Sequence, residues 1–373
     1  MRRFVAWLPL YFFIALIGLL IGSRPGLIRY AARSAMERVR GHSVAPDAPA
    51  AALDSSQVAL GRALFFDPIL SANKERACAS CHIPVRGLSD GRRVALAMDK
   101  GDLPRNAPGL MNVSDQVTFF WDGRAVSLED QIDGPMHSHK ELGGLTRRQI
   151  EGRLDSIPEY RALFQGTYGT AHPQWPDAKR AIASFERTLR SSQSTVDRWW
   201  KHEIPDSEIP AQVRRGFDLY AGRAQCSRCH FLPLTTSVIP GDFATQEFQV
   251  IGVPADSSGL SLDPDPGHFT VTHLDADRRA FKAPSLRNVA HTSPYMHNGA
   301  FETLDQVIRF YNRGGGRGLG LDVPNQAPEI RPLHLSAEDE AALVRFLEAL
   351  SDDPNTLATP SHVPSGLPPG GKY

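Results

Sequence analysis

The sequence predicts a mainly helical protein of two domains with long loops, preceded by an apolar N-terminal helix. Segments of helical periodicity recur along the 373 residues, whereas the strict alternation typical of strands is nearly absent. A Cys-x-x-Cys-His motif follows a predicted helix once in each half, which we interpret as a weak internal duplication. At about 150 residues per domain, the length fits two or three domains.

The N-terminus combines Arg2 and Arg3 with an uncharged run over residues 4–22. The length of this run approaches the ~20 residues that cross a hydrocarbon core. Residues 1–22 therefore predict either a cleaved secretory signal or a membrane anchor, and the lack of a clear small-residue cleavage site favours the anchor. Both interpretations place the body of the protein in the periplasm. Residues 23–52, rich in Arg, Ala and Pro, are expected to form a tether.

The first domain is expected over residues 53–205. Asp67-Pro68 ends its first helix, because proline does not fit a helix interior. Thr146 and Gln149 have the spacing of a capping box, which predicts the start of another helix. The expected helices of this domain cover residues 56–66, 146–154 and 177–191.

The second domain is expected over residues 206–355, after a boundary segment at 203–210 that contains two Ile-Pro pairs. One helix precedes its Cys-x-x-Cys-His motif, and two more helices are predicted over residues 303–312 and 336–350. Residues 356–373 are rich in Pro, Gly and Ser, so a disordered tail is predicted there.

The charges argue against a nucleic-acid partner. Lys and Arg together number 41, as do Asp and Glu, but residues 1–45 hold seven Arg and one acidic residue. The remainder is therefore mildly acidic, without the excess of positive charge that nucleic-acid binding requires. All four cysteines belong to the two short motifs, which excludes a disulfide scaffold.

The two motifs predict two covalently bound c-type haems. Cys78, Cys81 and His82 form the first, and the second has the same spacing. Two thiols add to the vinyl groups of a haem, and the adjacent histidine binds the iron. A zinc site or a redox dithiol are the alternatives, but each cysteine pair carries its own histidine and no cysteine is left over. The expected haem-binding residues are Cys78, Cys81, His82, Cys226, Cys229 and His230.

From Ser55 to about Leu350 the chain resembles the bacterial di-haem cytochrome c peroxidases and their MauG branch. The resemblance rests on Phe-Trp-Asp-Gly-Arg at 120–124, Gln-x-x-Gly-Pro at 131–135 and Ala-Pro-Ser-Leu-Arg-Asn-Val at 283–289. Arg-Asn-Ala-Pro at 105–108 and Pro-Tyr-Met-His-Asn-Gly at 294–299 add to it. It implies two cytochrome-c-like domains, with a peroxide-reacting haem in the first and an electron-transfer haem in the second.

The resemblance also implies a catalytic set at the first haem. Glu141 is expected to move a proton between the peroxide oxygens, with Gln131 and Pro135 beside it. Trp121 is expected to lie between the haems and to relay electrons. The histidine that blocks the open iron position in classical members is replaced by Met98, so we expect an open first haem. Met98 as a thioether ligand, or as simple loop packing, are the two alternatives.

Tyr311 is the expected distal ligand of the second haem. Leu304, Val307, Ile308 and Tyr311 share one helical face behind a Thr303 cap, and the family position of Tyr311 is Met in classical members and Tyr in the MauG branch. A phenolate favours oxidised iron more than a thioether does. A plain core aromatic is the alternative. The resemblance further implies a calcium ion, and the matching positions are Asn106, Thr292 and Pro294.

The function predicted from these residues is reduction of hydrogen peroxide, with electrons from a small cytochrome c or cupredoxin. One alternative is a MauG-like enzyme that oxidises Trp or Tyr residues of a partner protein, although the tryptophan that MauG uses for this is Ala224 here. The other alternative is a di-haem electron carrier without catalysis.

Overall fold

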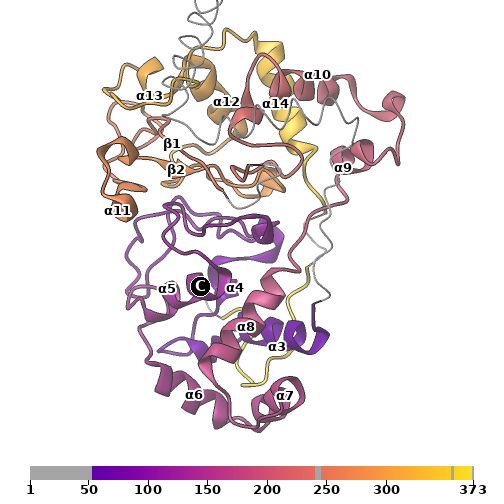
Figure 1. The fold of residues 1–373 in the computed structure, drawn as a ribbon, viewed down its shortest axis with the longest axis vertical. Coiled ribbons are helices and arrows are strands. Elements are labelled where there is room, and N and C mark those ends of the chain that lie inside the picture. Colours follow the sequence, from indigo (N-terminus) through magenta and orange to yellow (C-terminus); the bar gives the residue numbers. More distant parts are fainter. Residues whose placement is uncertain (1–52, 240–244, 354–356, 372–373) are drawn as a thin grey trace, which may run out of the picture.

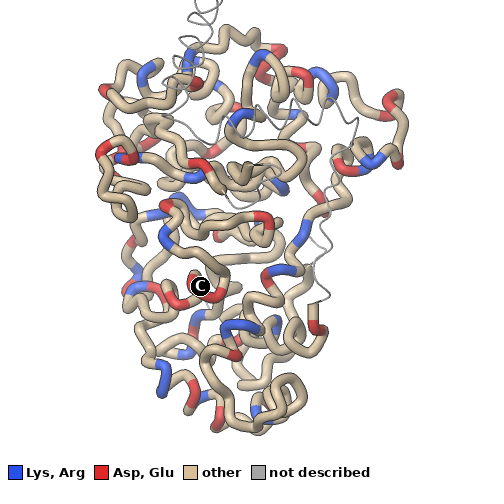
Figure 2. The backbone as a smooth tube through the Cα atoms, in the orientation of Figure 1, with Lys and Arg blue, Asp and Glu red and all other residues tan. Residues whose placement is uncertain are grey.

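The computed structural model describes residues 53–239, 245–353 and 357–371, in two halves stacked along the long axis (Figure 1). The prediction of a mainly helical chain with little sheet is confirmed. The expected leader at 1–22 and tether at 23–52 lie outside the described residues. Among the described residues, no helix has both the length and the apolar character needed to cross a membrane. Acidic and basic residues are interspersed over both halves (Figure 2).

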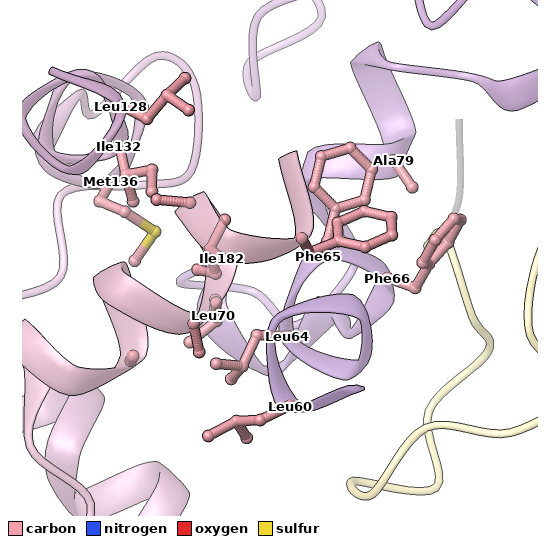
Figure 3. Close-up of a cluster of buried hydrophobic side chains, with 14 of the residues drawn as sticks. Leu60, Leu64, Phe65, Phe66, Leu70, Ala79, Leu128, Ile132, Met136 and Ile182 are labelled. Atoms are coloured by element: carbon pink, nitrogen blue, oxygen red, sulfur yellow. The ribbon is translucent and has the colours of Figure 1, made fainter. Parts of the chain in front are cut away.

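The N-terminal half folds around a core shared by its first and last helices. Leu60, Leu64 and Phe65 are fully buried and pack with Ile182 and Phe185, as Figure 3 shows for the labelled members of this cluster. The helices of this half are α3 (Ser55–Phe66), α4 (Cys78–Cys81), α5 (Leu128–His137), α6 (Arg147–Asp155), α7 (Pro158–Tyr168) and α8 (Trp175–Glu186).

The C-terminal half has its own core, centred on Tyr220, Ala342 and Phe346. Its two short strands, β1 (Phe248–Gln249) and β2 (Phe281–Lys282), pair antiparallel. Its helices are α9 (Thr195–Trp200), α10 (Ala211–Ala221), α11 (Phe269–Thr272), α12 (Leu304–Arg313), α13 (Gly315–Gly318) and α14 (Ala337–Glu348). Short 3-10 helices cover Pro68–Leu70, Pro84–Arg86, Val113–Asp115, Asp206–Glu208, Cys226–Arg228, Asp275–Asp277 and Val289–His291.

Each half is built on one close helix crossing at a glycine. A Cβ added to Gly61 of α3 would lie 1.8 Å from the Ala181 carbonyl oxygen of α8. A Cβ added to Gly216 of α10 would lie 2.1 Å from the Ala342 carbonyl oxygen of α14. The missing side chain lets the two backbones approach, so both halves pack a helix that precedes the cysteine motif against the last helix of the half. This shared arrangement agrees with the internal duplication inferred from the sequence.

Two boundaries and one helix differ from the sequence expectations. The helix expected over 177–191 ends at Glu186, where the Thr188 hydroxyl donates to the Phe185 carbonyl (2.6 Å) and the chain turns away. The helix α7 is not among the sequence predictions. The two cores divide between Leu189 and Val196, earlier than the 203–210 segment, so α9 packs with the C-terminal half.

The expectation of a disordered tail at 356–373 is wrong for residues 357–371. This segment returns to the N-terminal half, where Val363 is fully buried. The Ser365 hydroxyl donates to Asp67 Oδ1 (2.5 Å), and the Gly370 N–H donates to the Phe66 carbonyl (2.7 Å). The small polar residues that suggested disorder instead satisfy buried groups of a distant element.

The two halves meet through loops that surround Trp121. Arg105 binds Asp122 in its own half and Asp265 in the other, each at 2.7 Å. The Lys282 N–H donates to the Trp121 carbonyl (3.1 Å), and the Asn106 N–H donates to the His297 carbonyl (2.7 Å). These main-chain and ionic contacts fix the loops of one half against those of the other.

Candidate haem sites and active centre

The first cysteine motif lines a cavity of about 750 Å³ in the N-terminal half. Cys78 and Cys81 lie at the two ends of α4, and all three motif residues face the cavity. The Nδ1 atom of His82 lies 2.8 Å from the Leu88 carbonyl, so it donates there and leaves Nε2 as the free lone pair. Burial lowers the pKa of His82, which keeps the imidazole in the neutral, metal-binding form.

The second motif lines a smaller cavity of about 180 Å³ in the C-terminal half. The Nδ1 atom of His230 lies 3.0 Å from the Pro284 carbonyl, and burial lowers the pKa of His230 to about 4. Tyr311 of α12 lines the same cavity. Burial raises the pKa of Tyr311, and the nearby Cys229 and Cys226 add to the rise. The structure therefore brings Tyr311 and His230 to one cavity.

The cysteines have the chemistry of attachment residues and not of a redox pair. Burial raises the pKa of Cys78, Cys226 and Cys229 to about 12. A redox dithiol instead needs a lowered thiol pKa. Within the described ranges no cluster of three or more His, Cys, Asp or Glu is placed to hold a metal ion by itself. A histidine and two neutral thiols at the edge of a roomy apolar cavity fit a covalent haem.

The predicted catalytic residues converge on the first cavity. Gln131 and Pro135 come from α5, Glu141 from the loop that follows α5, and Trp121 from the loop before it. Ser127 caps α5 by accepting a hydrogen bond from the Asp130 N–H (3.0 Å), which fixes where the helix begins. The segment that runs from Trp121 to Glu141 thus contributes these four residues to the cavity that the first cysteine motif also lines.

Glu141 is a half-buried acid in this cavity. Burial raises its pKa, and the opposing effects of the Ser138 hydroxyl and the Arg124 guanidinium are smaller. Arg124 lies 3.5 Å from the centroid of the Phe120 ring and binds Asp122 at 2.9 Å, so its charge is partly neutralised. A carboxyl with a raised pKa in a cavity is suited to proton transfer.

Three residues line both cavities, namely Trp121, Lys282 and Pro284. The Trp121 indole N–H donates to the Asn106 carbonyl (2.9 Å), and its ring meets His297 edge-on at 6.4 Å. Trp121 therefore forms part of a common wall between the two cavities, held by hydrogen bonds at both its ring and its main chain.

Met98 is not among the residues that line the first cavity. Its N–H donates to the Lys140 carbonyl (2.7 Å), and its sulfur lies beside Gly143. The position therefore packs a loop. Ala224 is buried and lines the second cavity, whereas Trp199 and Trp200 pack against Phe217 in the second core.

One of the positions matched to calcium is hydrogen-bonded to the segment that contains the other two. The Asn106 N–H donates to the carbonyl of His297, which follows Pro294 by three residues. The Asn106 amide nitrogen donates to the Arg92 carbonyl (2.7 Å), which leaves Oδ1 as the oxygen donor. The Thr292 hydroxyl donates to the Val289 carbonyl (3.1 Å), so Thr292 would use its backbone oxygen. Oxygen donors suit a hard cation, and calcium at this place stays a prediction.

Two buried charged residues of the cavities escaped the sequence analysis. Glu186 lines the first cavity with Oε2 lacking a hydrogen-bond partner among the described residues, and Lys282 lines both cavities. A lysine in the apolar run Ala-Phe-Lys-Ala-Pro at 280–284 is the one sequence signal that points to burial.

Comparison with known proteins decides the family. The family model of di-haem cytochrome c peroxidases matches residues 55–204. The methylamine utilization protein MauG of Methylorubrum extorquens is 35% identical over 324 residues, covering 87% of this chain and 86% of that protein. The chain belongs to the di-haem cytochrome c peroxidase family.

Other relatives of the family agree with this assignment. The cytochrome-c peroxidase IdrP1 of Denitromonas iodatirespirans is 33% identical, covering 80% of this chain and 82% of that protein. The crystal structure of a MauG-like protein associated with microbial copper homeostasis superposes with a TM-score of 0.73 at 29% identity, covering 81% and 91% of the two chains. The chain is therefore a haem oxidoreductase of the peroxide-reducing type, and the family implies two c-type haems.

Proposed function

We propose that this chain reduces hydrogen peroxide in the cavity of its N-terminal half, with electrons that a donor protein delivers to the C-terminal half. The observation that carries this proposal is the presence of Gln131, Pro135 and Glu141 in the same cavity as His82. Bound at the two motifs, the haems would supply the electron transfer to peroxide. The residues that would hold them are Cys78, Cys81 and His82 in the first cavity, and Cys226, Cys229, His230 and Tyr311 in the second.

Glu141 carries the proton chemistry in this proposal. Its carboxylate would move a proton from one peroxide oxygen to the other, so that the O–O bond breaks and one water leaves. Two electrons from the donor, which the haems would pass on, and two protons from solvent reduce the remaining oxygen to a second water. Burial raises the pKa of Glu141 above that of an ordinary carboxyl, which favours proton uptake from peroxide. The greater volume of the first cavity supports an open side there, whereas Tyr311 lines the smaller second cavity.

Trp121 connects the two cavities in this proposal. The indole lies in their common wall, where it shortens the path that an electron follows between them. Calcium at Asn106, Thr292 and Pro294 would hold the same wall, because Asn106 accepts the indole N–H. We place the protein in the periplasm, since covalent haem attachment of this type and an apolar leader both accompany export.

Oxidation of a partner protein is the second candidate function. Tyr311 at the second cavity favours it, because a phenolate ligand stabilises oxidised iron and would lower the drive to accept electrons from a cytochrome. Ala224 argues against transfer of the MauG reaction itself, because an alanine lines the second cavity at the position where MauG has its tryptophan. An electron carrier without catalysis is the least favoured, since it has no use for Glu141 in the first cavity.

Steady-state kinetics separate these candidates. The purified protein, loaded with both haems, is mixed with a reduced small cytochrome c or cupredoxin and hydrogen peroxide, and oxidation of the donor is followed. We expect peroxide-dependent turnover. Negligible turnover, with long-lived oxidation of the protein after peroxide addition, would support the second candidate. No spectral response to stoichiometric peroxide would contradict both.

A further inference from the structure

Lys282 is a buried charge in the wall between the two cavities. It ends β2, and its main-chain N–H donates to the Trp121 carbonyl at 3.1 Å. The residue is 8% exposed and lines the first cavity as well as the second. Of the three residues that line both cavities, only Lys282 can carry a charge.

The hydrogen-bond partners of the Lys282 ammonium are neutral. It donates to Gln116 Oε1 and to the Thr118 carbonyl (3.0 Å), and the Phe119 ring centroid lies 5.9 Å away. An ammonium in such a place is costly unless an anion pairs with it. Burial accordingly lowers the pKa of Lys282 to about 7.

The negative charge of Asp122 opposes the effect of burial and raises the pKa of Lys282. Its own oxygens are committed elsewhere, because Asp122 binds Arg105 at 2.7 Å and Arg124 at 2.9 Å. Arg105 in turn binds Asp265, so this network holds two guanidinium groups against two carboxylates. The network is balanced without Lys282, and the lysine adds one positive charge that no carboxylate of the network binds directly.

A bound haem would bring carboxylates of its own, the two propionates. We propose that Lys282 is a positioning residue that takes a haem propionate as its counter-anion and whose single positive charge raises the reduction potentials of both haems together. A positive charge beside a haem favours the ferrous over the ferric state, and in a low-dielectric wall its effect extends to both sides. The inference rests on the proposed function only in placing one haem in each cavity.

The test is a spectroelectrochemical titration of the purified holoprotein at fixed pH. Lys282→Met keeps the length of the side chain and removes its charge, and Lys282→Arg keeps the charge. The matched control is Lys201→Met, at an exposed lysine outside both cavities. We expect K282M to lower both midpoint potentials, K282R to stay near the wild type, and K201M to leave both unchanged.

An unchanged potential at either haem in K282M would overturn the proposal, as would an equal fall of both potentials in K282R. Pyridine haemochrome spectra report haem content, and if K282M loads poorly, Lys282→Gln carries the same prediction with a polar side chain. The potentials are measurable even in a protein that does not turn over peroxide. Failure of this inference is therefore distinguishable from failure of the proposed function.

Discussion

At the scale of single residues, substitution of Glu141 should remove the proton transfer of the proposed reaction. Glu141→Gln keeps the shape of the side chain but can neither take nor give the proton of the proposed reaction. We expect peroxide turnover to fall by about 10²–10⁴-fold, the range typical of a lost general acid–base group. The measurement is the steady-state rate at saturating peroxide and reduced cytochrome c, for variant and wild type with equal haem content.

The pH dependence of the same reaction offers a control. The pKa of Glu141 is raised by burial, so the rate should rise with pH through a point above the ordinary carboxylate range of about 4.3. This rise should vanish in Glu141→Gln and persist in Glu203→Gln, a variant of an acid that is 46% exposed. Equal pH profiles in all three proteins would remove Glu141 from the proton transfer.

Glu186 should make stability depend on pH. Burial raises its pKa from 4.5 to about 8, so the folded state prefers the protonated carboxyl. The stability that this preference contributes is complete below pH 4.5 and is lost as pH rises through about 8. Glu186→Gln cannot ionise. The difference in free energy of unfolding between E186Q and wild type should therefore shift in favour of E186Q as the pH rises from 4.5 to about 8. Urea denaturation of the holoproteins at pH 5, 6.5 and 8.5 measures this, with Glu208→Gln, an exposed position, as control. The same pH dependence of the free energy of unfolding in E186Q and wild type would refute the expectation.

At the scale of elements, the helix crossing at Gly216 should tolerate no side chain. The added Cβ of Gly216→Ala would also lie 2.6 Å from the Phe346 Cβ, so α10 and α14 must separate. Overpacking of this kind costs about 1–3 kcal/mol. Gly152→Ala in α6 is the matched control, because nothing lies within 4 Å of its added Cβ, and it should stabilise by about 0.5–1 kcal/mol. Chemical denaturation of both variants decides, and equal midpoints would contradict the close crossing.

Elements with local start signals were predictable, and elements defined by distant contacts were not. Thr303 and Gln306 cap α12 reciprocally, and the helix begins at Leu304 as its capping residues indicate. The end of α8 was not predictable, because its apolar face continues past Glu186 to Leu189, which is buried in the same core after the helix has ended. Helix α7 begins at Pro158 without a side-chain cap and buries only Tyr160 and Phe164.

At the scale of the whole molecule, some residues of the candidate site could be predicted from local sequence, and others depend on contacts with distant parts of the chain. The haem motifs and the run from Gln131 to Glu141 are local in sequence, so their chemistry could be predicted from spacing and resemblance. The role of Lys282 depends on burial beneath Trp121, 161 positions away in the chain, and no local pattern reports that distance. The course of residues 357–371 was missed for the same reason, since Ser365 binds Asp67.

The C-terminal segment should stabilise the half that it crosses. Asp67 is fully buried, and it accepts hydrogen bonds from the Tyr160 hydroxyl (2.8 Å), the Ser365 N–H (3.1 Å) and the Ser365 hydroxyl. Near its end the segment also reaches the first haem motif, where the Ser80 hydroxyl donates to the Gly370 carbonyl (2.7 Å). Removal of the Ser365 hydroxyl leaves Asp67 Oδ1 with the Ile69 N–H (2.9 Å) as its remaining donor, and the loss of one hydrogen bond to a buried carboxylate costs about 1–3 kcal/mol.

We therefore expect Ser365→Ala to lower the free energy of unfolding by this amount in urea, whereas Ser361→Ala, at an exposed position of the same segment, should change it little. A chain that stops at Asp353 should lose more of its free energy of unfolding, because the core residues that cover the fully buried Val363 also become exposed. Limited proteolysis should then cut its N-terminal half first, since the lost contacts all lie there. Equal denaturation of S365A, S361A and wild type would show that the segment rests on the surface without holding it.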